Sequence, residues 1–270
     1  MMKILKSNKG VTLVEILLAV LLTGIISAVM FRVYINQHHA WNIQDSVIEM
    51  QQNARASIDE LTRQIRMAGY DLPNGLNAFE ASNTDPDTIM LHYRTSSCDA
   101  PIVNSMPNPS SELSCDGYDV SCFEEGQIAY IHDPNTESGE FFTITEVQTG
   151  SSHIQHNTSV LSKAYPSGSN LYTIEKVKYY IDYSDTLHPR LMVQFGNALP
   201  QIYAEDIADL QFTYTLRNGI TMDSPTLVND VRRISIAVTA RTERSDIEFE
   251  EEPYRFETYQ SQVYLRNLGT

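Results

Sequence analysis

The pattern of apolar and polar residues divides the chain into a helical part and a strand-rich part. Residues 11–31 form an apolar run with one charged member, Glu15. As a helix, this run rises about 31 Å, the hydrocarbon thickness of a membrane. We therefore predict a membrane-spanning helix over 11–33, and the pair His38 and His39 is expected to mark the membrane exit.

A second apolar pattern continues the helix beyond the membrane. Apolar or small residues recur at steps of three and four and so share one helical face. They are Ile43, Val47, Met50, Ala54, Ile58, Leu61, Ile65 and Ala68. No proline interrupts residues 1–70, and Gly69 is a typical helix end. The pattern predicts one helix over 11–68, whose amphipathic outer part, 34–70, packs on the rest of the protein. A coiled-coil seam is the alternative interpretation.

From residue 85 onward the period becomes that of extended strands. Short β-branched and aromatic runs are bounded by Gly, Pro, Asn or Asp. These runs are 87–94, 127–132, 140–147, 171–183, 190–195, 234–240 and 259–265. No comparably long helix intervenes, so the sheet should be mainly antiparallel. The predicted class is α+β: a long N-terminal helix, transmembrane and then amphipathic, packed on a mainly antiparallel β-sheet head formed by 71–270.

The charges favour an anchored protein with an exported head. The 270 residues carry 34 acidic and 19 basic side chains, a net charge of −15. Such an acid excess disfavours non-specific nucleic-acid binding, so we expect no nucleic-acid partner. Residues 1–10, by contrast, contain three lysines and no acid. By the positive-inside rule, this leader stays in the cytoplasm and the head lies outside it.

Glu15 needs an explanation because a carboxylate in hydrocarbon costs about 2.5–3.5 kcal/mol. A plain signal anchor would not require it, and a removable secretory signal would need a cleavage site that is not convincing here. The segment Gly10-Val11-Thr12-Leu13-Val14-Glu15 before the apolar helix resembles the class III signal of type IV prepilins and pseudopilins.

That resemblance implies specific roles for three residues. A prepilin peptidase would cut between Gly10 and Val11, and Val11 would become the N-methylated mature terminus. Glu15 would make an assembly contact with the buried amino terminus of a neighbouring subunit, because pairing two charges recovers much of their desolvation cost. Many family members carry phenylalanine where this chain has Val11.

Three further segments resemble PilW-type minor pilins: 61–70 at the helix end, 204–214 in the centre and 263–268 at the C-terminus. The first is also similar to J-type minor pseudopilins of type II secretion. In the second, Ile207, Leu210, Phe212 and Tyr214 should leave a helical turn and enter an alternating strand that packs in the sheet.

The resemblance implies a type IV pilin-like fold and a minor pilin that acts in the initiation of pilus assembly or at the tip. The implied location is the bacterial inner membrane, crossed once with a cytoplasmic N-terminus, and then the pilus fibre on the cell surface. The implied partners are other minor and major pilins and the inner-membrane assembly platform.

The three cysteines fit an oxidising compartment. Cys98, Cys115 and Cys122 lie in one loop-like stretch, so one disulfide is expected. If the 87–94 and 127–132 strands are neighbours, Cys98 and Cys122 lie near opposite ends of the connecting loop, which favours that bridge. Cys115 is then an alternative partner or a free thiol. Zinc explains the stretch less well, because no C-x-x-C pair is present.

The remaining candidates for chemistry favour structural interpretations. Residues 133–140 place oxygens as a calcium loop does, but a hairpin turn explains them better. His153 and His156 have no indicated third metal ligand, and the acidic stretch 246–252 is expected to be a solvated loop. No catalytic motif is recognisable.

We therefore predict a non-enzymatic assembly protein without cofactor or metal. A minor pseudopilin of type II secretion is one alternative. A tip adhesin or ligand-binding module is another, and it would require an exposed aromatic or metal site in the head.

Overall fold

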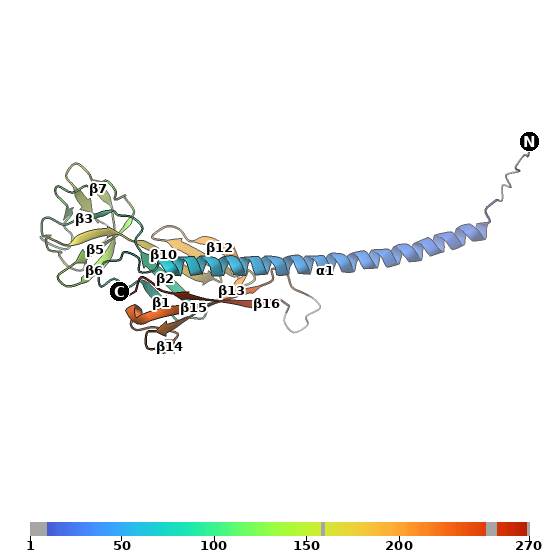
Figure 1. The fold of residues 1–270 in the computed structure, drawn as a ribbon. Coiled ribbons are helices and arrows are strands. Elements are labelled where there is room, and N and C mark those ends of the chain that lie inside the picture. The colour runs from blue at the N-terminus through green and yellow to red at the C-terminus, as the bar shows by residue number, and fades with distance from the viewer. Residues whose placement is uncertain (1–9, 158–159, 247–252, 269–270) are drawn as a thin grey trace, which may run out of the picture. The chain divides into compact units, whose positions relative to one another are not determined.

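The computed structural model describes residues 10–157, 160–246 and 253–268 (Figure 1). The chain divides into two compact units, residues 1–48 and 49–270. Helix α1 (Leu13–Met67) has 55 residues and belongs to both units. The single long helix predicted from the sequence is confirmed, and its ends lie close to the expected positions.

The C-terminal segment of the chain caps the end of helix α1. Gly69 has a φ of 81°, a conformation that favours glycine. A Cβ atom at Gly69 would also lie 3.2 Å from Asn267 O. The Asn267 amide donates to the carbonyls of Arg66 (3.1 Å) and Ala68 (3.3 Å). Carbonyls left unpaired by the end of the helix are thus satisfied by a residue far along the chain.

Two sheets form the part of the head that adjoins the helix. The five-stranded sheet has the order β1 (Phe79–Ser82), β2 (Thr88–Tyr93), β10 (Glu175–Asp182), β11 (Arg190–Phe195) and β12 (Gln201–Glu205). The β13 sheet has the order β14 (Thr221–Met222), β13 (Ile207–Leu216), β15 (Val231–Arg241) and β16 (Phe256–Tyr264), with a 3-10 helix η1 (Val228–Asp230) before β15. Their apolar faces meet, and the Phe79 and Tyr214 rings stack with centroids 5.4 Å apart.

Two smaller sheets form a separate part of the head, which we call the cystine lobe (residues 98–173). One sheet has the order β3 (Asp99–Pro101), β9 (Asn170–Thr173), β5 (Ile128–Asp133) and β6 (Ser138–Thr143). The other has the order β4 (Leu113–Ser114), β8 (His153–Gln155) and β7 (Glu146–Gln148). The lobe has its own buried apolar cluster, which includes Ile131, Ile154 and Leu171. Figure 1 shows its strands gathered at one end of the head.

The strand pairs among the described residues are antiparallel, as expected. They are distributed over four sheets, whereas the sequence suggested one. The runs 140–147 and 171–183 each divide into two strands that lie in different sheets. Each run is apolar both before and after the point where the chain passes from one sheet to the next, so its composition does not mark that point.

Two other expectations were wrong. The alternation that begins at Ile207 is not preceded by a helical turn, because Gln201–Glu205 is strand β12 and Asp206, with a φ of 56°, turns the chain into β13. Strands β2 and β5 are not neighbours either: β2 pairs with β1 and β10, whereas β5 pairs with β6 and β9.

The predicted apolar face of the outer helical half is buried in the head. Its most buried members are Met50, Ala54, Leu61, Ile65 and Ala68, at 0–4% exposure. Two polar residues that the apolar period did not select, Ser57 and Gln64, share this face. Burying a Leu or Ile side chain contributes about 1.5–3 kcal/mol, so this face anchors the helix to the sheets.

Candidate functional site

The described chain begins at Gly10, so the predicted leader lies outside the described residues apart from its last residue. Gly10 and Val11 are exposed and precede the helix. A Cβ atom at Gly10 would meet nothing within 4 Å. The peptide bond between these two residues is therefore open to an enzyme in this structure.

Thr12 and Glu15 form a capping box at the start of helix α1. Thr12 N donates to Glu15 Oε2 at 2.8 Å, and Glu15 N donates to Thr12 Oγ1 at 3.3 Å. Thr12 Oγ1 also donates to Glu15 Oε2 at 3.0 Å. The pattern T-x-x-E at residues 12–15 is a capping signature that the sequence itself contains. Glu15 thus has a local role in starting the helix, in addition to any contact with a neighbour.

The apolar segment that follows presents its side chains outward on all sides. Its 18-residue window of highest hydropathy, 2.5 on average, is 0% buried. Leu13, Leu17 and Leu21 are 58–76% exposed. The described part of the chain contains one helix, α1, that is long and apolar enough to cross a membrane by length and composition. Water is a poor environment for such a surface, so this segment requires lipid or other apolar helices around it.

Aromatic residues follow the apolar segment. Tyr34, His38 and Trp41 recur along one side of the helix, with neighbouring ring centroids 6.1 and 6.3 Å apart. Asn42 Nδ2 lies 3.0 Å from His38 Nδ1. Tyr and Trp are enriched where a helix leaves the hydrocarbon. The membrane exit is expected at His38 and His39, and Tyr34 and Trp41 on either side of them are residue types typical of such a boundary.

A polar cluster joins the outer helical half to the five-stranded sheet. Glu60 Oε1 accepts hydrogen bonds from Tyr179 OH (2.9 Å) and Gln64 Nε2 (3.0 Å). Gln64 Oε1 in turn accepts from Tyr93 OH at 2.9 Å. Burial by itself would raise the pKa of Glu60, but hydrogen bonds from Gln64, Arg63 and Tyr179 outweigh it and lower that pKa. The helix is therefore oriented on the sheet by directional contacts as well as by apolar packing.

The structure joins Cys98 to Cys122, the pairing favoured from the sequence. Their Cα atoms are 5.7 Å apart. The bridge closes a segment of the cystine lobe that contains β3 and β4, and the strands before and after this segment, β2 and β5, are not paired with each other. Cys115 is free and buried, and burial raises the pKa of its thiol to about 12. It is therefore protonated and unreactive near neutral pH.

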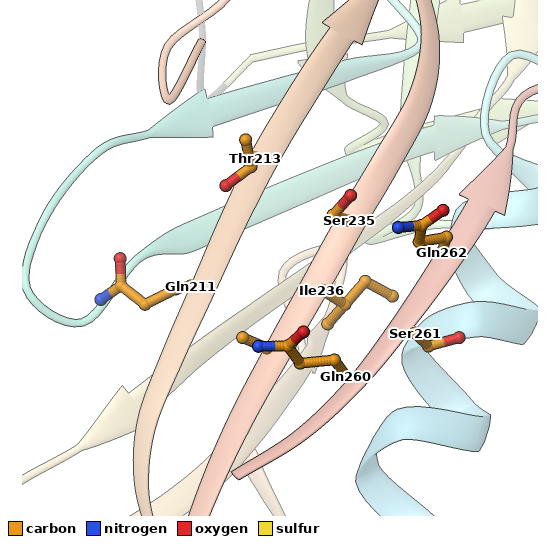
Figure 2. A pocket seen from close by; sticks show the side chains of 8 residues that line it. Gln211, Thr213, Ser235, Ile236, Gln260, Ser261 and Gln262 are labelled. Atoms are coloured by element: carbon orange, nitrogen blue, oxygen red, sulfur yellow. The ribbon is translucent and has the colours of Figure 1, made fainter. Parts of the chain in front are cut away.

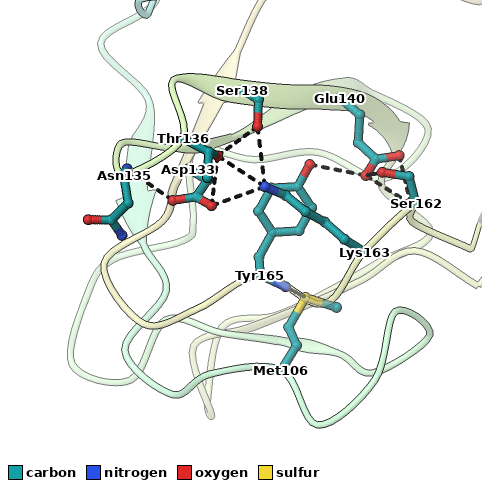
Figure 3. A network of polar contacts seen from close by, with 9 residues as sticks. All are labelled: Met106, Asp133, Asn135, Thr136, Ser138, Glu140, Ser162, Lys163 and Tyr165. Carbon is teal, nitrogen blue, oxygen red and sulfur yellow. Dashed lines mark hydrogen bonds and ion pairs between the residues drawn. The ribbon is translucent and has the colours of Figure 1, made fainter.

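A lysine ammonium occupies the centre of the calcium-like loop. The 133–140 segment is a hairpin turn between β5 and β6, as expected. Lys163 Nζ donates to Asp133 Oδ2 (3.0 Å), Thr136 Oγ1 (3.1 Å) and Ser138 Oγ (3.2 Å) (Figure 3). The ammonium thus satisfies the oxygens that a bound cation would otherwise contact. Lys163, with hydrogen bonds from the Thr136 hydroxyl and the Asn135 backbone, lowers the pKa of Asp133 to about 2.

The other polar candidates are engaged in ordinary contacts. His153 lies between Glu112 and Asp116, at 3.1 Å from each carboxylate, and His156 Nε2 lies 2.8 Å from Ser111 O. Within the described residues, no three His, Cys, Asp or Glu side chains are placed to hold a metal ion. The acidic stretch 246–252 is described only at Asp246, which is buried and pairs with Arg255 at 2.5 Å.

No protein-family model and no curated protein sequence matches the chain. Among solved structures, the chain is similar to a type IV-like pilin from Thermus thermophilus, with a TM-score of 0.40 and 9% sequence identity. The superposition covers 81% of this chain and 98% of that protein.

Proposed function

We propose that this chain is a minor pilin of a type IV pilus, acting in the initiation of pilus assembly or at the tip. The observation that carries the proposal is the start of helix α1. The apolar segment is exposed along its length and carries one carboxylate, Glu15, near its start. It is preceded by Gly10, which is accessible to a peptidase. The alternative of a type II secretion pseudopilin uses the same N-terminal features, so they do not favour it over a pilin.

In the proposed mechanism, a prepilin peptidase cuts between Gly10 and Val11 and Val11 is then N-methylated. The apolar segment moves from lipid into a bundle of pilin helices, where the same exposed side chains become buried. Glu15, held at the helix start by Thr12, presents its carboxylate to the amino terminus of an adjacent subunit. Pairing these charges in the apolar bundle recovers much of the cost of burying either one.

Cleavage is tested by co-expressing the chain with a prepilin peptidase and measuring the mass of the membrane-extracted protein. The wild type should lose about ten residues and gain one methyl group. Gly10→Val should remain at full length, because a branched side chain then lies at the cut. Gly24→Val is the matched control, since a Cβ atom there also meets nothing within 4 Å. Shortening of both variants would contradict the cleavage assignment.

Assembly is tested with Glu15→Ala and Glu15→Gln in cells that form pili. Both variants should insert into the membrane, because removing a carboxylate from the apolar segment lowers the cost of insertion. Both should be depleted from sheared pili at least severalfold relative to wild type. The glutamine variant retains a hydrogen-bonding group but not the charge, so normal incorporation of Glu15→Gln would argue against charge pairing.

A further inference from the structure

The outer face of the β13 sheet has a shallow groove of about 440 Å³ that the assembly role does not use. Its polar lining comes from three adjacent strands, β13, β15 and β16. The polar lining residues are Gln211, Thr213, Ser235, Gln260, Ser261 and Gln262 (Figure 2). In the strand register, Thr213, Ser235 and Gln262 form one row across the sheet. Gln211, Ala237 and Gln260 form the next row.

All the residues that line the groove are uncharged, although the chain carries a net charge of −15. Outward positions on a solvated sheet are commonly charged, and here hydroxyl and amide groups take their place. An anionic ligand would be repelled by the overall charge of the protein. A cation would find no carboxylate among the lining residues. The groove is therefore suited to a neutral polar ligand.

Two charged residues at the border fix the direction of the amides. Arg233 Nη1 donates to Gln262 Oε1 at 3.2 Å. The NH2 group of Gln262 is therefore available to donate to a ligand in the groove. Gln211 Nε2 donates to Asp209 Oδ1 at 3.0 Å, which leaves the Gln211 carbonyl oxygen as an acceptor. The groove thus presents an oriented donor on one side and an oriented acceptor on the other before any ligand binds.

An exposed aromatic residue, Tyr264, pairs with Arg233 in the row of the sheet next to the one that contains Ser235 and Gln262. Tyr264 is two residues beyond Gln262 on the same strand, so both side chains are on the outer face. Tyr264 is 63% exposed. Sugar hydroxyls both donate and accept hydrogen bonds, and the C–H face of a sugar ring packs on aromatic rings. We propose that this groove binds a neutral oligosaccharide.

Binding is tested by calorimetric titration of the full chain in a phosphocholine detergent, because maltoside detergents would themselves present sugars. The probes are cellohexaose and hexa-N-acetylchitohexaose, with hexagalacturonate as the anionic comparison. We expect saturable binding of at least one neutral probe, and at least tenfold weaker binding of hexagalacturonate. Failure of both neutral probes to saturate at about 10 mM would overturn the proposal. Equal binding of the anionic probe would overturn the assigned ligand class.

The decisive variant is Gln262→Glu, which keeps the shape of the side chain and gains an ion pair with Arg233. It replaces the oriented donor with a carboxylate, so binding should weaken at least tenfold while the unfolding temperature stays equal or rises. Gln148→Glu on β7 makes the same change outside the groove and should bind as wild type does. Equal binding by all three proteins would contradict the role of the groove.

The face could instead be covered by a second copy of the chain. Analytical ultracentrifugation of wild type and Gln262→Glu distinguishes this outcome. A dimer that Gln262→Glu dissociates, in a protein that binds neither neutral probe, would assign the groove to a protein interface and overturn the oligosaccharide proposal. Neither result depends on pilus assembly, so the proposal can fail while the proposed function holds.

Discussion

Two stretches of helix α1 show how one continuous helix can depend on different surroundings. Between Leu13 and Tyr34 the apolar side chains are exposed and nearly every position is apolar. Between Met50 and Ala68 only one face is apolar, and it is buried in the head. Both stretches satisfy the hydrogen bonds of their own backbone, so the difference lies in what covers the side chains.

The comparison separates what the chain can stabilise alone from what needs other molecules. The outer stretch gains its stability from contacts within the chain, both apolar and directional. The apolar side chains of the inner stretch are exposed, and its capping box at Thr12 and Glu15 only defines where the helix starts. The inner stretch is therefore suited to exchange one apolar environment, lipid, for another, a bundle of helices.

The largest test of this difference is a matched pair of leucine truncations. Leu61→Ala should lower the free energy of unfolding of the head by about 2–5 kcal/mol, because Leu61 is fully buried and a cavity remains. Leu22→Ala should leave that free energy unchanged within about 0.5 kcal/mol, since Leu22 is 49% exposed and is not one of the buried core residues. Urea unfolding in detergent, followed by near-ultraviolet circular dichroism, measures both. Equal losses would mean that the two stretches are not energetically distinct.

Removing the disulfide tests whether the cystine lobe is stabilised independently of the packing of the head on helix α1. Replacing both Cys98 and Cys122 by Ser should cost about 2–4 kcal/mol, because the bridge closes a loop of 24 residues. Cys115→Ala is the control that leaves the bridge intact. In the native wild type, Cys115 should resist thiol reagents at pH 8, since its pKa of about 12 keeps it protonated. Rapid labelling of Cys115 would show that the lobe opens locally.

The helix and most strands could be predicted because their periodicity is local. The disulfide pairing was also anticipated, but from a strand adjacency that the structure does not contain. The changes of sheet near Ile174 and Asp206 could not be predicted, because they depend on which distant strand covers each segment. The Glu60 cluster was missed because each of its members looks like an ordinary surface or core residue until β2 and β10 bring two tyrosines to the helix. The capping box, by contrast, was visible in the sequence and was overlooked beside the stronger pilin-like signal.

The polar contacts between helix and sheet should have a smaller effect that depends on pH. Tyr179→Phe removes the hydroxyl that donates to Glu60 and should cost about 1–2 kcal/mol, whereas Tyr180→Phe on the opposite face of β10 should cost less than about 0.5 kcal/mol.

The pKa of Glu60 in the folded protein is below its ordinary value of 4.5. Its ionised form therefore contributes stability that is complete above about pH 4.5 and is lost as the pH falls through the folded pKa. Glu60→Gln should flatten this acid dependence in chemical denaturation between pH 3 and 6. An unchanged pH profile would show that the cluster is not electrostatically coupled to folding.

The smallest expected effect concerns the Lys163 ammonium, which lies against Asp133 in the β5–β6 turn of the cystine lobe. Lys163→Met removes the charge but keeps an unbranched side chain, so the pKa of Asp133 should rise from about 2 toward its ordinary value of 3.8. Because the folded pKa of Asp133 is depressed, the pair stabilises the fold above about pH 3.8, and that stability is lost as the pH falls toward 2. Lys163 is partly exposed, so the effect on stability at pH 7 should stay below about 1 kcal/mol.

Carboxyl carbon chemical shifts of Asp133, measured by NMR between about pH 2 and pH 4, give its pKa directly, and the same titration of Lys176→Met serves as the control. A pKa of Asp133 that stays near 2 without Lys163 would mean that the turn hydroxyl and backbone donors, and not the ammonium, hold the carboxylate in its ionised form.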